Sequence, residues 1–293
     1  MPVHRFVQVD AFTSRPFFGN PVAVVLGADD LAPEEMQRIA AWTNLSETTF
    51  VLEPTIPGPA YRLRIFTPEH ELPFAGHPTV GSCHAVIEAG VVEPREGRLV
   101  QECGAGVLPL CVEGSGPERR IHVEAPEAKC MGAFPGLADA ASAALGARIA
   151  DPPAPAAFCN GPNWLFVCFE KESQLSSLAP DLSAVAKLSL EHSVSGIAAF
   201  AFVDRGGFRV HIRCFAPAFG VPEDPVTGSA NAALPAYLAH HGLLQRTGSE
   251  YVATQGSEMG RDGRVHVRIL DASGRAQIGG QAVTVVEGEL RLA

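Results

Sequence analysis

Two segments of the chain, residues 66–82 and 215–229, read as versions of one another. Each passes from a β-rich stretch through Phe-x-Pro and a proline-containing loop to a Gly-Ser pair and an alanine-containing helical run. Pro78 and Pro225 hold equivalent places, and their offset of 147 residues (225 minus 78) is about half of the 293-residue length. The spacing predicts a duplicated domain with one polar, helix-opening loop in each half and a cleft between the halves.

Composition limits the class of protein. Hydrophobic residues make up 46% of the chain and charged residues 18%, which is typical of a packed globular core. The net charge is −10 with only 22 Lys and Arg residues, so we expect no nucleic-acid and no membrane partner, either of which favours a basic surface. Residues 1–10 read as a first strand and not as a signal peptide. No apolar run approaches the roughly 18 residues of a membrane-spanning helix. We expect a cytoplasmic protein.

The seven cysteines are scattered and form no Cys-x-x-Cys pair, so the sequence signals neither a zinc knuckle nor a thioredoxin-like site. Their odd number and mostly apolar surroundings predict reduced, mainly buried thiols. His240 and His241 are adjacent and would point apart on a helix, and no other set of potential ligands has metal-binding spacing. We therefore expect no metal.

The pattern in each half predicts several strands and one mostly apolar helix, at about 79–90 and 228–241. A helix that is apolar on most faces is usually enclosed by other elements. The order of elements lacks the alternating βαβ rhythm of a doubly wound fold. We predict an α+β fold of two pseudo-duplicated domains, each a curved mixed β-sheet wrapped around a central α-helix.

The domain boundary is predicted in the break-prone linker 113–118, which lies near the expected midpoint. This gives a first domain over residues 1–117 and a second over residues 118–293. The strand near 282–293 is a candidate to return to the first domain.

The two helix starts are candidate binding sites. Unpaired backbone N–H groups and a partial positive charge at a helix N-terminus attract anions, most simply a carboxylate. Gly76, Gly228 and Ser229 keep the side chains small there, so a ligand can approach the backbone, and Ser229 adds a hydroxyl. The Gly-Ser pairs are equally explained if they only allow close packing of the helix start, and both interpretations stay open.

His77 and Asp224 stand directly before the two equivalent prolines. An aspartate N-cap followed by proline is a common helix opening, so Asp224 has a structural explanation as well as a functional one. His77 is a poorer cap, which favours a functional role. A histidine and an aspartate on the two sides of a cleft would form a proton-handling pair.

Glu47 is the third polar candidate. Asn44 with Glu47 three residues later resembles a capping box, but the residues that follow are strand-like and leave no helix to cap. Glu47 would then lie at the mouth of a strand between Ser46 and Thr48. A carboxylate in that place could act as a general base.

Several motifs together resemble the PhzF family of phenazine-biosynthesis-like isomerases. They occur in order along nearly the whole chain, and the Leu-Pro-Phe-Ala-Gly-His-Pro and Glu-Asp-Pro-x-Thr-Gly-Ser segments are specific. The matching segments are 19–24 (Gly-Asn-Pro-Val-Ala-Val), 44–50 (Asn-Leu-Ser-Glu-Thr-Thr-Phe), 66–68 with 71–78, 223–231, Gln255-Gly256 and Arg261.

The resemblance implies the diaminopimelate-epimerase-like fold, with an active site between two similar domains. It also implies an isomerase that moves a proton on a small, carboxylate-bearing substrate without metal or organic cofactor. The family's acid/base glutamate falls on Glu47, and its supporting active-site residues fall on His77, Asp224 and Ser229. We add Asn20, Gly76 and Gly228 as substrate-binding residues, and expect a homodimer.

Two alternatives stay open at this point. One is a small-molecule-binding protein of the same fold that has lost turnover. The other is an amino-acid racemase that uses two thiols, as related epimerases do. The catalytic thiols of those epimerases fall near Pro78 and Pro225 of this chain. Cys83 and Cys214 are close to these prolines in sequence, but they are expected inside the central helix and in a strand.

Overall fold

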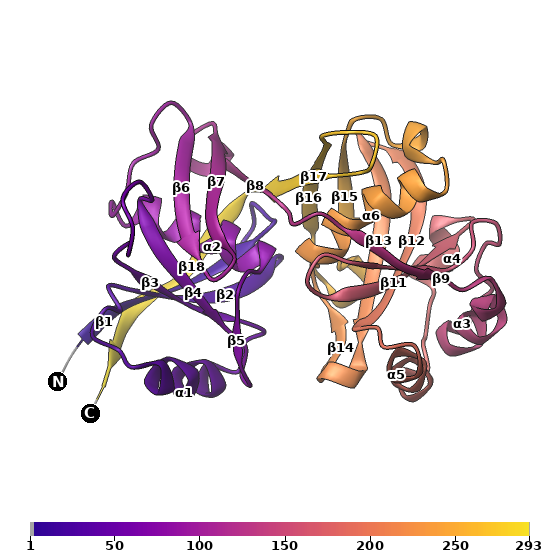
Figure 1. Cartoon of the computed structure of the whole chain (residues 1–293), viewed down its shortest axis with the longest axis horizontal. Coiled ribbons are helices and arrows are strands. Elements are labelled where there is room, and N and C mark those ends of the chain that lie inside the picture. The colour runs from indigo at the N-terminus through magenta and orange to yellow at the C-terminus, as the bar shows by residue number, and fades with distance from the viewer. Residues whose placement is uncertain (1–2, 293) are drawn as a thin grey trace. The chain divides into compact units, whose positions relative to one another are not determined.

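The computed structural model describes residues 3–292 and contains two compact units (Figure 1). The first unit comprises the described residues up to Glu124 and those from Gly279 onward, and the second comprises Ala125–Ile278. The limits at residues 117 and 118 stay a prediction of domain boundaries, because packing within one chain does not test whether either part folds alone.

The first unit is built on one mixed sheet. Its strands are β1 (Val3–Ala11), β2 (Asn20–Leu26), β3 (Thr48–Leu52), β4 (Tyr61–Phe66), β5 (Glu71–Leu72), β6 (Arg98–Cys103), β7 (Gly106–Glu113), β8 (Arg120–Glu124) and β18 (Ala282–Arg291). The pairing order is β18, β1, β2, β3, β4, β6, β7, β8, with short β5 also paired to β4. The β2–β3 and β4–β6 pairs are parallel and the others are antiparallel.

Two helices belong to this unit, α1 (Pro33–Thr43) and α2 (Gly76–Glu88). Helix α1 follows its predicted pattern, because its buried residues Met36, Ile39 and Ala40 form one stripe that packs near β3 and β4. Helix α2 contacts β1, β2, β3, β4, β8 and β18, and every residue of Gly76–Val86 is buried. The sheet is therefore wrapped around α2, which confirms the predicted central helix.

Helix α2 begins earlier than predicted, at Gly76 instead of residue 79. Pro78 is its third residue, and a proline is tolerated there because the first backbone N–H groups of a helix have no intrahelical acceptor. His77 consequently lies inside the first helical turn, where it is 8% exposed.

The second unit repeats this plan. Its strands are β9 (Lys129–Ala133), β10 (Ala156–Cys159), β11 (Asn163–Phe169), β12 (Gly196–Arg205), β13 (Phe208–Ala216), β14 (Val221–Asp224), β15 (Glu250–Gln255) and β16 (Gly263–Ile269), followed by β17 (Ala276–Gly280), which ends among residues of the first unit. They pair in the order β9, β10, β11, β12, β13, β15, β16, with β14 also on β13; the β11–β12 and β13–β15 pairs are parallel.

Four helices accompany this sheet: α3 (Ala138–Leu145), α4 (Glu172–Ser176), α5 (Leu182–Glu191) and α6 (Gly228–His240). Short 3-10 turns cover Gly116–Glu118, Pro135–Leu137, Pro217–Phe219, Leu244–Arg246 and Ser257–Met259. Within residues 3–292, no helix has the length and apolar character needed to cross a membrane.

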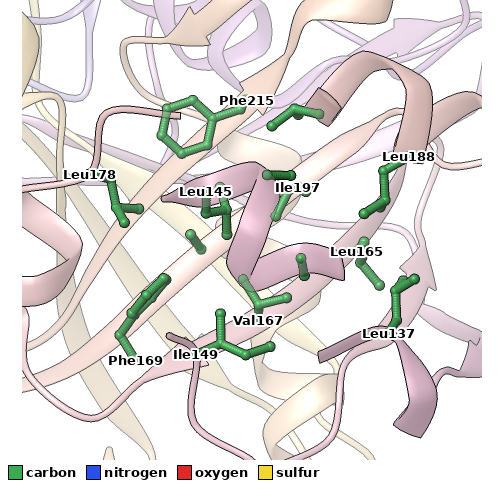
Figure 2. Packing of buried hydrophobic residues seen from close by; sticks show 14 of the residues in the cluster. Leu137, Leu145, Ile149, Leu165, Val167, Phe169, Leu178, Leu188, Ile197 and Phe215 are labelled. Atoms are coloured by element: carbon green, nitrogen blue, oxygen red, sulfur yellow. The ribbon is translucent and has the colours of Figure 1, made fainter. Parts of the chain in front are cut away.

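The two faces of strand β11 pack against different helices. Leu165 and Val167 point into an apolar cluster with Leu145 of α3 and Leu188 of α5 (Figure 2). Because successive side chains of a strand alternate between faces, Phe166 lies on the other face, and its ring is 5.5 Å from that of Tyr237 in α6. Helix α6 therefore packs on the face opposite α3 and α5.

A glycine permits the close approach of α2 to its sheet. A Cβ added at Gly81 would lie 2.4 Å from Cγ1 of Val22 in β2, which is far shorter than any van der Waals contact. Val22 is fully buried and branched at Cβ, so it has little freedom to move away.

We expect Gly81→Ala to lower the free energy of unfolding by about 1–3 kcal/mol, as overpacked cores do. Urea denaturation would measure it, with Gly288→Ala as the control because a Cβ there meets nothing within 4 Å. Adding Val22→Ala should make room, so the double variant should lose less than the sum of the single losses. Wild-type stability of Gly81→Ala would show that the helix can shift at no cost.

Candidate active site

Glu47 lies in the turn between α1 and β3. Helix α1 ends at the C-cap Asn44, whose φ of 55° is in the left-handed region, a conformation that asparagine tolerates better than most residues. Strand β3 then begins at Thr48, so Glu47 stands at the mouth of a strand, as its sequence context predicts. Its side chain is only 15% exposed.

His77 is the partner of Glu47. The Nε2 atom of His77 lies 3.3 Å from Oε2 of Glu47, and both side chains are largely buried. The first turn of the buried central helix and the turn before β3 thus bring a carboxyl and an imidazole together. Such a pair can share or pass a proton.

Burial raises the pKa of Glu47 from its ordinary value of 4.5 to about 7, while a hydrogen bond from the Ser46 side chain acts in the opposite direction. Removing a carboxylate from water penalises its charged form, which is the cause of the shift. A group with a pKa near neutral pH is well matched to take up and release a proton.

Two buried hydroxyl groups connect the elements that carry this pair. The Thr49 hydroxyl of β3 donates to the carbonyl of Ala23 in β2 at 3.1 Å and lies 2.8 Å from the Ser82 hydroxyl of α2. Both residues are fully buried. One side-chain contact therefore ties the strand that follows Glu47 to the helix that carries His77.

The other predicted residues of the first unit are placed separately. Gly76 is the first residue of α2, directly before His77. Asn20 is the first residue of β2, is 1% exposed, and pairs with Ala11 of β1. Their roles in substrate binding stay predictions.

Asp224 does not have the helix-capping position that its sequence context favours. The N-cap of α6 is Thr227, and Asp224 is the last residue of β14, three positions earlier. The Thr227 hydroxyl donates to Oδ2 of Asp224 at 2.7 Å. The chain between Pro225 and the helix is needed to turn out of the strand, and this displaces the aspartate from the helix start.

Gln255, at the end of β15, organises this loop. Its Nε2 donates to the Asp224 carbonyl at 2.9 Å and to the Thr227 hydroxyl at 2.8 Å. Its Oε1 accepts from the Thr227 N–H at 2.9 Å and from Asn231 Nδ2 at 3.1 Å. Because Thr227 Oγ1 accepts from Gln255, its own proton is available to Asp224. This role of Gln255 was not predicted, although its place at a strand end beside a glycine was a usable signal.

Ser229 stands in the first turn of α6, directly after Gly228. The indole N–H of Trp164 donates to its Oγ at 2.9 Å, and Asn160 Nδ2 donates to its carbonyl at 2.9 Å. Neither partner was predicted, since each lies more than 60 residues away in sequence.

The thiols considered for a two-thiol mechanism are deeply buried. Cys83 in α2 and Cys214 in β13 are both 0% exposed. Burial raises the pKa of Cys83 to about 12 and raises that of Cys214 well above its ordinary value. Thiolates are thus disfavoured at both positions. Among residues 3–292, no group of three or more His, Cys, Asp or Glu side chains is arranged to hold a metal ion.

Comparison with solved structures defines the class of fold. The structure of a hydroxyproline epimerase from Agrobacterium vitis, with bound trans-4-hydroxy-L-proline, superposes with a TM-score of 0.66 at 13% identity and covers 98% of this chain and 92% of that chain. At that identity the likeness concerns the fold alone. It confirms the predicted epimerase-like architecture.

The family follows from closer matches. The family model described as "Phenazine biosynthesis-like protein" (PhzC-PhzF) matches residues 9–288. A PhzF-family protein from Bacillus anthracis has a TM-score of 0.84 at 29% identity, with all of both chains covered. The trans-2,3-dihydro-3-hydroxyanthranilate isomerase of Pseudomonas aeruginosa is 37% identical over 99% of this chain and 100% of its own length. "Antisense-enhancing sequence 1" of Schizosaccharomyces pombe is also 37% identical, over 99% of each chain. The chain belongs to the PhzF family.

The raised pKa of Glu47 leads to a prediction about stability. The folded state holds the Glu47 proton more tightly than the unfolded state, so this residue's contribution is most favourable below pH 4.5 and is lost as pH rises to about 7. Glu47→Gln removes the ionisation. Relative to wild type, we expect the variant to gain stability over this pH range, by up to about 3 kcal/mol.

Chemical denaturation at pH 4.5, 6 and 8 would measure this gain. Glu53→Gln is the matched control, because Glu53 is exposed and directly follows the far end of β3. It should show no comparable gain. Parallel pH profiles for Glu47→Gln and wild type would mean that the carboxyl is not penalised by burial.

Proposed function

We propose that this protein is an isomerase that moves a proton within a small carboxylate-bearing molecule, such as a ring carboxylate or an amino acid. The observation that carries the proposal is the buried Glu47, with a pKa of about 7, at 3.3 Å from His77. Family membership and the isomerase names of relatives support it.

In the proposed reaction, the Glu47 carboxylate removes a proton from a carbon next to an activating group. The electron pair of that C–H bond shifts into the substrate, and the carboxylic acid formed at Glu47 returns a proton to a second carbon. Atoms and electrons balance without an external oxidant or reductant. His77 would hold the Glu47 carboxyl in position and stabilise its charged carboxylate form. General acid–base catalysis requires a group that is positioned in this way.

We assign Asp224 and Ser229 to the same reaction as binding residues. Ser229 follows Gly228 at the start of α6, where backbone N–H groups and the helix dipole favour a carboxylate. The Asp224 carboxylate, oriented by Thr227, would accept a hydrogen bond from an amino or hydroxyl group of the substrate. Cofactor independence, a homodimer and a cytoplasmic location stay predictions.

The second candidate function is small-molecule binding without turnover. It is favoured by the S. pombe relative, whose name describes no enzymatic activity although it is as similar in sequence as the P. aeruginosa isomerase. The two functions differ in one measurable respect, since only an isomerase exchanges substrate protons with solvent.

We expect wild-type protein in D₂O to convert trans-2,3-dihydro-3-hydroxyanthranilate, or another member of a panel of cyclic carboxylates and amino acids, and to introduce deuterium at the carbon that receives the proton. Glu47→Gln should lower the rate on the order of 10²–10⁴-fold, because it keeps the shape but removes the base. Mass spectrometry and NMR would follow both. Glu53→Gln is the control and should turn over as wild type.

Turnover by Glu47→Gln at the wild-type rate would reduce Glu47 to a structural residue. Ligand binding without deuterium incorporation across the panel would instead favour the binding protein.

We also expect Cys83→Ala and Cys214→Ala to keep activity, because both thiols are buried and hold their protons at neutral pH. Initial rates per folded molecule would test this, with folding checked by circular dichroism. A large loss of rate in both folded variants would restore the two-thiol racemase.

A further inference from the structure

We propose that Trp164 is a positioning residue that makes Ser229 a hydrogen-bond donor, and so selects ligands that present a carboxylate. The inference rests on the proposed function in one respect, namely that Ser229 binds the ligand. It concerns only residues of the second unit.

The polarity follows from the chemistry of the indole ring. The Trp164 Nε1–H can only donate, so the Ser229 Oγ at 2.9 Å must accept. The serine hydroxyl has one proton, and no acceptor for it is present among residues 3–292. With one lone pair held by the indole, that proton remains for an acceptor outside the protein. Ser229 is partly exposed, so a ligand can reach it.

Trp164 is firmly held, as a positioning residue must be. It is 5% exposed and stands opposite Gly196 in the parallel β11–β12 pair. A Cβ at Gly196 would lie 2.9 Å from the Cζ3 atom of the indole and 2.2 Å from the Phe215 carbonyl. The glycine therefore leaves the space that the indole ring occupies on the α6 side of the sheet.

The same hairpin also fixes the serine backbone. Asn160 follows β10 and directs its Nδ2 to the Ser229 carbonyl at 2.9 Å. Asn160, in the turn, and Trp164, in β11, belong to one hairpin, and their two contacts hold the backbone and the side chain of one residue. A hydroxyl fixed in this way offers a preorganised donor, which lowers the cost of binding a carboxylate.

The hydrogen bond can be observed without any activity assay, because the chain has only two tryptophans. In ¹H–¹⁵N spectra of protein labelled with ¹⁵N-tryptophan, the Trp164 indole N–H should exchange slowly, and Trp42, which is 75% exposed, is the internal control. Ser229→Ala should shift the Trp164 resonance and speed its exchange while leaving Trp42 unchanged. An unmoved Trp164 resonance would overturn the proposal.

The second experiment tests ligand selection with anthranilate, a ring carboxylate, as the probe. Trp164→Phe keeps an aromatic ring but removes the donor, so anthranilate affinity by calorimetry should fall about 3- to 10-fold, the equivalent of one hydrogen bond. In the Ser229→Ala background the same substitution should change nothing, because Trp164 acts through Ser229. Independent, multiplicative losses would overturn the proposal, as would failure of wild type to bind anthranilate at millimolar concentration.

Phe166→Leu is the control for lost packing. Phe166 lies on the same face of β11 and contacts α6 through Tyr237, but its side chain forms no hydrogen bond. We expect it to lower the melting temperature while leaving the affinity of the folded protein for anthranilate unchanged. An affinity loss equal to that of Trp164→Phe would assign the effect to packing and overturn the proposal.

The failure of this inference and the failure of the proposed function are distinguishable. If Trp164→Phe weakens anthranilate binding only when Ser229 is present, but no substrate exchanges deuterium, the isomerase proposal fails and the role of Trp164 stands. Turnover with equal kcat/KM for Trp164→Phe and wild type would remove the role of Trp164 and leave the isomerase.

Discussion

The burial of one helix inside each sheet is the constraint on which the rest of the structure depends. Helix α2 is buried along nearly its whole length, and ten of the thirteen residues of α6 are buried. A helix enclosed in this way satisfies its interior backbone within itself, but its first N–H groups have no partner there. Polar side chains or ligands must therefore gather at the helix start, and this is where His77 and Ser229 lie.

The two helix starts meet this requirement differently. In the first unit, the Glu47 carboxyl beside His77 is buried away from solvent, and burial raises the pKa of Glu47 to about 7. In the second unit, the helix start is held by several hydrogen bonds, four of which are made by the Gln255 side chain around Thr227. Burial suits a carboxyl group that takes up and releases a proton, whereas several hydrogen bonds on one side chain suit groups that keep one orientation.

The sequence predicted the repeated plan because the plan is local. Phe-x-Pro, the loop, the Gly-Ser pair and the apolar helix are contiguous, and the start of α6 at Gly228 and of β3 at Thr48 were foreseen from neighbouring residues. Of the two interpretations of Asp224, the helix cap was wrong, because the length of chain needed to leave β14 depends on the sheet. The role of Trp164 could not be predicted, since it reaches the α6 start from 65 residues away through strand pairing. Gln255, 28 residues away, was noted as part of a motif, but its contacts depend on the same pairing.

The direction of each hydrogen bond at the α6 start is set by groups that can only donate. An indole N–H can only donate, and the amide nitrogen of Gln255 can only donate, so the Ser229 and Thr227 hydroxyls must both accept from the sheet. Thr227 donates its single proton to the Asp224 carboxylate, and Ser229 keeps its own for the proposed ligand. Two neutral donors of the sheet, the Trp164 indole and the Gln255 amide, thus orient an acceptor at Asp224 and a donor at Ser229. A substrate with a carboxylate and a neighbouring amino or hydroxyl group has the complementary pattern.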